Sequence, residues 1–140
     1  MTRMMMALWA ALALGFMSST AHAQDDWPNM TGVWSGTSES VVIGDTLHHE
    51  PGDMPHLSSL TFTFTIEGQD GRRFWGMLSS PHDTEPVVGA IANDRHTLYF
   101  ADSDGYGFVE LVSDDVMDVC YVHATESSQV AACITHTRQP

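Results

Sequence analysis

The stretch SSLTFTFTIE, residues 58–67, decides the fold class of this chain. Its apolar residues occupy every second position and threonines fill most positions between them, which is the period of a β-strand with one apolar and one polar face. Seven further short runs are rich in Thr, Val, Phe and Tyr, at residues 31–43, 72–79, 86–92, 97–102, 106–112, 116–123 and 129–138. No long stretch shows the apolar period of a helix, so we expect an all-β fold of eight strands.

The links between these runs predict how the strands are connected. From the second run onward they are mostly short turns rich in Gly, Asp, Asn and Ser, and short links join antiparallel neighbours. Because closure of a sheet removes its exposed edges, we expect an antiparallel up-and-down barrel, a meander; a two-sheet sandwich is the alternative. The link at residues 44–57 is much longer, and a loop of this length in a small domain is typical of a functional lid.

The sequence does not decide which side chains of the third run, residues 72–79, point into the barrel. A three-residue turn with Gly71 in the left-handed conformation puts Phe74 and Leu78 inside the barrel, whereas a four-residue turn puts Trp75 and Met77 inside. The turn residues by themselves allow both.

The N-terminus has the features of a secretory signal. One arginine precedes an apolar run at residues 7–17, and small residues follow at 21–23. The run is too short to span a bilayer, and an uncleaved N-terminal anchor is the alternative. We therefore expect a cleaved signal peptide at residues 1–23, an extended segment at 24–30, one barrel domain at 31–140, and a location in the periplasm or outside the cell.

Charge excludes several classes of partner. The chain of 140 residues has a formal net charge of −13, and all five of its basic residues are arginine. Nucleic acids and anionic membranes are bound by clustered Lys and Arg, so we expect neither as a partner and no membrane span in the mature form. The chain lacks a phosphate-binding glycine loop, a metalloprotease motif and a nucleophile elbow, so no cofactor is expected.

The two cysteines give a register for the last hairpin. If Cys120 lies opposite Cys133, then His123 lies opposite Val130 and a compact turn joins the two strands. A cross-strand disulfide fits this register and an oxidising compartment; two reduced cysteines that merely face each other are the alternative. The same register predicts an inner wall that includes Met117, Val119, Tyr121, His123, Ile134, His136 and Arg138.

A known family shares several of these features. Gly32 and Trp34 form a Gly-x-Trp on the first strand, Arg138 closes the last strand, and a long loop follows the first strand. This pattern resembles the calycin superfamily, which includes lipocalins, fatty-acid-binding proteins and avidins. The resemblance implies that these three residues are structural, that the guanidinium of Arg138 stacks on the indole of Trp34 at the closed end of the barrel, and that the long loop is a lid.

A second resemblance is to small periplasmic inhibitors of metalloproteases and lysozymes, which are also disulfide-bearing barrels. The metalloprotease inhibitors of this kind use an extended N-terminal stretch to plug the protease. Residues 24–29 precede the barrel here and occupy the corresponding place.

The barrel interior is the first candidate site, because eight strands leave room for side chains or for one small ligand. We expect a small apolar or amphipathic ligand in the barrel mouth under the 44–57 loop, lined by Phe62, Phe64, Leu111, Met117, Tyr121, His123 and His136. The structural alternative is an interior filled by its own aromatic side chains. The second functional hypothesis is a periplasmic inhibitor or protein-interaction module that acts through loops or the N-terminal segment. The third is a small barrel enzyme that uses Tyr121 and His123 for acid–base chemistry.

The long loop is also a candidate metal site. Its imidazoles, His48, His49 and His56, and its nearby carboxylates suit Zn²⁺ or Cu²⁺ by ligand type. The alternative is a solvated, acidic lid. The acidic turns at residues 102–105 and 114–115 fit solvated turns better than calcium loops.

Overall fold

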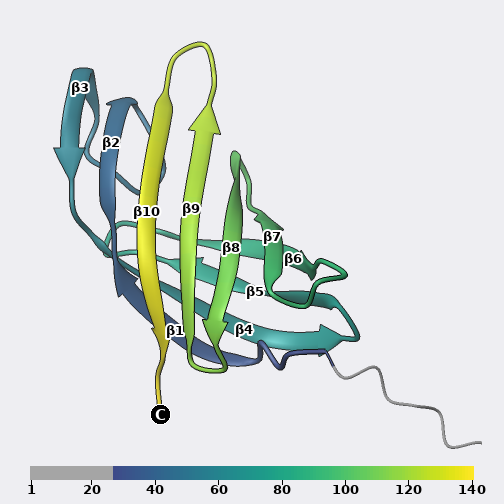
Figure 1. Ribbon diagram of the computed structural model, residues 1–140. Coiled ribbons are helices and arrows are strands. Elements are labelled where there is room, and N and C mark those ends of the chain that lie inside the picture. Colours follow the sequence, from purple (N-terminus) through teal and green to yellow (C-terminus); the bar gives the residue numbers. More distant parts are fainter. Residues whose placement is uncertain (1–26) are drawn as a thin grey trace, which may run out of the picture.

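The computed structural model describes residues 27–140, and this part of the chain forms ten strands and no helix (Figure 1). It therefore includes no helix long and apolar enough to cross a membrane. The predicted signal peptide and the first residues of the N-terminal segment lie outside the described residues. The strands are β1 (Gly32–Thr37), β2 (Glu39–Gly44), β3 (Gly52–Ser58), β4 (Thr61–Asp70), β5 (Arg73–Ser79), β6 (Thr84–Ile91), β7 (Thr97–Ala101), β8 (Gly105–Ser113), β9 (Val116–Ala124) and β10 (Gln129–Arg138).

The strands close into one antiparallel barrel. Hydrogen-bonded neighbours run in the order β1-β4-β5-β6-β7-β8-β9-β10, and β10 returns to β1 where Trp34 pairs with Arg138. The two remaining strands lengthen β1 and β4. β2 follows β1 in the chain and pairs with β10 in the same register as β1 does. β3 pairs with β2 in the same register in which β4 pairs with β1. The eight-stranded barrel is confirmed, and the sandwich alternative is wrong.

The lid predicted at residues 44–57 is wrong in its extent. Residues 52–58 form β3, and only residues 45–51 connect the two strands. Figure 1 shows β2 beside β10 and β3 beside β2, and β3 pairs with β2 alone within the described chain. The prediction missed β3 because Pro55 and its polar neighbours hide any alternation; proline is tolerated there because an edge strand need not donate on both sides.

The closed end of the barrel is filled by apolar side chains. Trp34 has no exposed surface, and its Nε1 donates to the carbonyl of Met30 at 2.9 Å. The guanidinium of Arg138 lies 4.0 Å from the centroid of the Trp34 ring, the contact that the calycin resemblance implies. Arg138 also donates to the carbonyls of Asn29 and Thr31, so it joins the last strand to the segment before the first.

The described part of the N-terminal segment covers this closed end. Trp27 is half-buried against the core, with the guanidinium carbons of Arg72 and Arg95 at 5.5 and 5.2 Å from its ring centroid. The amide of Gln69 donates to the carbonyl of Pro28 at 2.8 Å. This part of the segment therefore caps the chain's own barrel.

The turn after β4 is shorter than either predicted alternative, and a bulge within β4 sets the faces of β5. Asp70 pairs directly with Arg73, so the turn has two residues, and Gly71 takes a φ of 58° that favours glycine. A bulge between Ile66 and Gly68 shifts the register of β4, so that Phe74 points into the barrel.

The last hairpin has the register that the cysteines predict. Cys120 and Cys133 pair across β9 and β10 and form a disulfide with a Cα–Cα distance of 4.2 Å. His123 lies opposite Val130. The disulfide is confirmed, and it indicates an oxidising environment outside the cytosol.

A row of apolar side chains crosses the outer face of the barrel, and we call it the outer apolar row. Strand pairing aligns its members at one level, and Val88 and Leu57 are 60% and 88% exposed. Its members, in order from β5 to β3, are Trp75, Val88, Ala101, Tyr106, Val122, Ala131, Val41 and Leu57.

Candidate functional site

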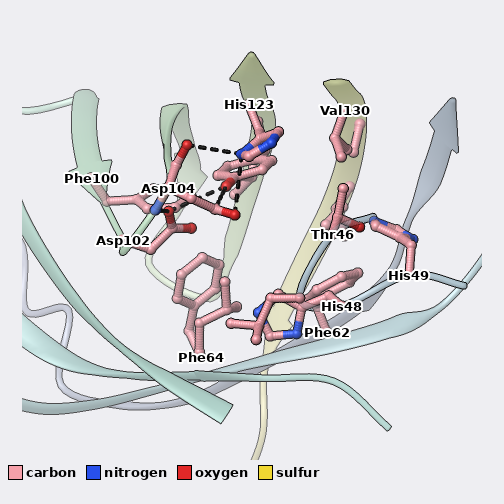
Figure 2. A pocket seen from close by; sticks show the side chains of 16 residues that line it. Thr46, His48, His49, Phe62, Phe64, Phe100, Asp102, Asp104, His123 and Val130 are labelled. Carbon is pink, nitrogen blue, oxygen red and sulfur yellow. Dashed lines mark hydrogen bonds and ion pairs between the residues drawn. The ribbon is translucent and has the colours of Figure 1, made fainter. Parts of the chain in front are cut away.

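The open end of the barrel contains a partly enclosed cavity of about 40 Å³ (Figure 2). Its walls are apolar and its roof is the connection between β2 and β3, residues 45–51, which we call the mouth segment. The roof residues are Thr46, Leu47, His48 and His49, and the wall residues include Phe62, Phe64, Phe100, Tyr121, Ala132 and Ile134. This volume is that of a few water molecules, and drug-sized ligands occupy roughly 300–1,000 Å³, so the mouth segment fills most of the mouth.

Stacked aromatic rings form one wall of the cavity. The rings of Phe100 and Tyr121 are nearly parallel, with centroids 6.2 Å apart, and Phe64 meets Phe100 edge-on at 5.0 Å. Gly107 lies between the two stacked residues on β8, where a Cβ would be 1.9 Å from the Phe100 ring. Glycine at this position therefore permits the flat aromatic wall.

His48 anchors the mouth segment. Its Nε2 donates to Oε1 of the buried Glu85 at 2.9 Å, and its Nδ1 lies 2.9 Å from the hydroxyl of Ser80. The imidazole also packs edge-on against Phe62, at 5.4 Å between ring centroids. Two polar contacts and one ring contact thus hold this side chain in the mouth.

His49 is the second anchor. Its Nδ1 lies 2.9 Å from the hydroxyl of Ser58, and the side chain is buried. Burial, followed by the neighbouring imidazoles of His48, His56 and His82, lowers the pKa of His49 to about 4. The ring is therefore neutral at physiological pH.

Three carboxylates meet beside the cavity. Oxygens of Glu85, Asp102 and Asp104 lie within 4.8 Å of one another. Glu85 accepts hydrogen bonds from the backbone N–H and the hydroxyl of Ser103. Asp102 Oδ1 accepts from the N–H of Gly105 at 2.8 Å, but its buried Oδ2 has no partner among the described residues. Burial and, next, the charge of Glu85 raise the pKa of Asp102.

Tyr121 and His123 bind the turns of the mouth together. The phenol donates to Asp102 and Asp104, and its burial and these carboxylates raise the pKa of Tyr121, so it stays protonated. His123 Nδ1 lies 2.9 Å from the carbonyl of Asp104, and its Nε2 lies 2.7 Å from the hydroxyl of Ser128. Because both imidazole nitrogens are engaged, this arrangement supports a positioning role for the pair.

The structure brings four of the predicted ligand residues to the cavity: Phe62, Phe64, Tyr121 and His123. It places the other three elsewhere. Met117 and Leu111 belong to the core of the closed half, and His136 is fully buried on β10, 5.1 Å from the Phe64 ring. Alternation predicted that these side chains point inward, but it does not give their height along the barrel axis.

The three histidines predicted as metal ligands are not brought together. His48 and His49 bind separate partners, and Nδ1 of His56 contacts the carbonyl of Met54 at 3.3 Å. Within residues 27–140, the group of side chains close enough to share a metal ion is the carboxylate set described above.

Several residues of the mouth were not predicted. Glu85 shares a face with Val87 and Ile91, so the period of two places its side chain inside; the sequence-based strand began one residue later. Asp102 was assigned to a solvated turn, yet its Oδ2 is buried. Phe100 lies two residues after Leu98 in a predicted strand, so the two side chains share the inner face. This period of two could have identified Phe100 as a residue of the barrel interior.

Comparison with known proteins gives distant relatives. No protein-family model matches the chain. Protein rot1 of Aspergillus terreus is 27% identical over 95 residues, which cover 66% of this chain and 40% of that protein. Protein rot1 of Emericella nidulans is 28% identical over 90 residues, covering 62% of this chain and 38% of that protein. The chain thus spans about two fifths of the length of these curated relatives.

One solved structure is also similar. The S-type phycobiliprotein lyase CPES from Guillardia theta is 9% identical, and the match covers 79% of this chain and 89% of that one with a TM-score of 0.31. The closed barrel described above rests on the strand pairings of this chain itself.

Proposed function

We propose that this chain binds a small apolar or amphipathic molecule in the mouth of the barrel, where the ligand replaces the side chains of the mouth segment. The observation that carries the proposal is an aromatic wall roofed by residues that are held mainly by polar contacts. The wall has the composition of a ligand pocket, apolar with a few placed polar groups. We further propose that the chain acts in the periplasm or outside the cell, as a calycin-like carrier.

Opening of the mouth segment is the step that makes room. Leu47 is 41% exposed, and His48 is held by hydrogen bonds to Ser80 and Glu85. Such contacts contribute modestly to the free energy of the closed state, because the same groups are hydrated when the segment opens. A ligand that binds only the open state shifts the population toward it.

Removal of the His48 anchor should therefore strengthen binding. We expect His48→Ala to bind n-octanol about 10-fold more tightly than the unaltered chain, because the closed state loses both hydrogen bonds and Oε1 of the buried Glu85 loses its donor. Isothermal titration calorimetry measures the difference. His96→Ala is the matched control, since it removes an exposed imidazole that lies near Trp27 at the closed end, and its affinity should not change.

Filling the cavity should have the opposite effect. Ala132 is buried and lines the cavity, and Ala132→Leu adds about three carbon atoms to a space of about 40 Å³. We expect n-octanol binding to fall about 10-fold or more in the same titration. Equal affinity of Ala132→Leu and the unaltered chain, with the disulfide and the β-sheet spectrum intact, would place binding elsewhere.

The outer apolar row favours a second candidate function, a protein-interaction module. Exposed aromatic residues continue the row on the next level, where Tyr99 and Phe108 meet at 5.9 Å and are each about half exposed. An exposed apolar patch of this kind is typical of a protein contact. The row faces outward, so this function is independent of the mouth.

The two candidates are separable by variants. If the chain acts through the outer apolar row, Tyr106→Asp should abolish capture of a partner from the exported protein fraction of the source organism, and Asp102→Asn should leave it unchanged. Capture that survives Tyr106→Asp rejects this surface.

A further inference from the structure

From the distribution of charge around the mouth, we infer that the ligand is an amphipathic amine whose protonated nitrogen binds at Asp102, beside the aromatic wall. The inference rests on the proposed function and adds the chemical class of the ligand. Three independent features of the described residues carry it: the placement of the basic residues, the unpartnered oxygen of Asp102, and the imidazole that occupies the mouth.

The arginines of the described chain lie away from the mouth. Arg72 and Arg95 flank Trp27, Arg73 pairs with Asp70 in the turn after β4, and Arg138 stacks at the closed end. All of these contacts involve the end of the barrel opposite the mouth segment, and the sequence contains no lysine. The carboxylates of the mouth thus have no guanidinium or ammonium partner in residues 27–140, and their field attracts cations.

Asp102 offers an acceptor at the cavity. Its Oδ2 is buried, lies in a residue that lines the cavity, and receives no hydrogen bond from the described residues. A buried carboxylate oxygen without a donor is costly, and a charged N–H donor satisfies it best. Burial and the charge of Glu85 raise the pKa of Asp102, and a bound cation would act against that shift. Thr46 Oγ1, on the roof of the same cavity, is also buried and has no hydrogen-bond partner among residues 27–140.

The chain itself already places a nitrogen donor in the mouth. His48 Nε2 donates to Glu85, one of the three clustered carboxylates. The ring of His48 lies against Phe62 (Figure 2). A carboxylate on one side and an aromatic ring on the other is the environment in which proteins bind organic ammonium groups. When the mouth segment opens, Glu85 loses this donor. An ammonium group bound at Asp102 then lies close to both carboxylates, while its apolar part lies along Phe100 and Tyr121.

The experiment compares three probes of equal chain length on the full mature chain by calorimetry at pH 7.5. n-Octylamine is a cation at this pH, n-octanol is neutral and n-octanoate is an anion. We expect n-octylamine to bind about 10-fold or more tightly than n-octanol, and n-octanoate to bind most weakly. Asp102→Asn should lower n-octylamine affinity to about that of n-octanol, and n-octanol affinity should stay within about twofold.

The control separates the site from the overall charge. Asp118→Asn makes the same charge change on the outer face of β9, away from the mouth, and should keep the preference for the amine. Equal loss of the preference in both variants would reject a site at Asp102. Equal binding of n-octylamine and n-octanol to the unaltered chain would overturn the amine inference and keep the proposed function. Absence of binding by all three probes would overturn both the amine inference and the proposed function. The comparison of the three probes uses the unaltered chain and needs no variant.

Discussion

Trp34→Ala is expected to lower the free energy of unfolding by about 4 kcal/mol, which is the usual range for truncation of a fully buried aromatic side chain. The indole has no exposed surface, donates to the carbonyl of Met30 and stacks under Arg138. It also lies where β1 and β10 pair to close the barrel. The substitution therefore removes core volume, a hydrogen bond and the packing beside the strand pair that closes the barrel. Urea denaturation followed by circular dichroism measures it.

Trp75→Ala is the matched control for this prediction. Trp75 lies on the outer face of β5 and is 46% exposed, so its truncation should cost less than about 1.5 kcal/mol. Equal destabilisation by the two substitutions would contradict the assignment of Trp34 to the sealed end of a closed barrel.

Acid should destabilise the barrel through His136. This imidazole is fully buried beside Phe64, and its nitrogens make no well-formed hydrogen bond within the described residues. Burial lowers the pKa of His136 from 6.5 to about 4, and the backbone of Phe62 offsets only part of this effect. As pH falls below 6.5 the unfolded state takes up the proton first. The stability that the neutral ring provides is thus complete above pH 6.5 and is lost as pH falls to about 4.

The size of this loss follows from the shift. Each pKa unit is worth about 1.4 kcal/mol, so His136 accounts for about 3 kcal/mol between neutral pH and pH 4. Other groups also titrate in this range: His49 acts in the same direction, and the raised pKa of Asp102 acts in the opposite one. The difference in the free energy of unfolding between the unaltered chain and a variant without this imidazole isolates the contribution of His136.

His136→Leu supplies that difference, because leucine has a similar volume and no charge. We expect the variant to be as stable as the unaltered chain at pH 7 and to be more stable by about 3 kcal/mol at pH 4. Urea denaturation at half-unit pH steps measures both curves. Parallel curves for the two proteins would show that His136 does not titrate on unfolding in this range.

Much of the fold can be predicted from local patterns of the sequence. The alternation around Phe62 and Phe64 and the short turns after it predict an antiparallel meander, because both patterns involve only residues close together in the sequence. The cysteine pair adds one long-range constraint, and it fixes the last hairpin in its observed register. The closing contact of Trp34 with Arg138 is the one that the calycin resemblance implies.

The mouth is harder to predict, because it depends on how far each residue lies along the barrel axis. His136 and Met117 point inward as the alternation requires, but they lie below the cavity. Glu85 and Asp102 come from separate strand ends that only the closed barrel brings together. The fold of the mouth segment over the cavity depends on contacts of His48 with side chains more than thirty residues away.

Whether the mouth is the ligand site can be measured by titrating ¹⁵N-labelled mature chain with n-octanol and following backbone amide shifts. Binding in the mouth predicts shifts at Thr46, His48, Asp102 and Tyr121, with Trp34 at the closed end unchanged. Shifts confined to the outer apolar row, or none at saturating n-octanol, would contradict a ligand site in the barrel mouth.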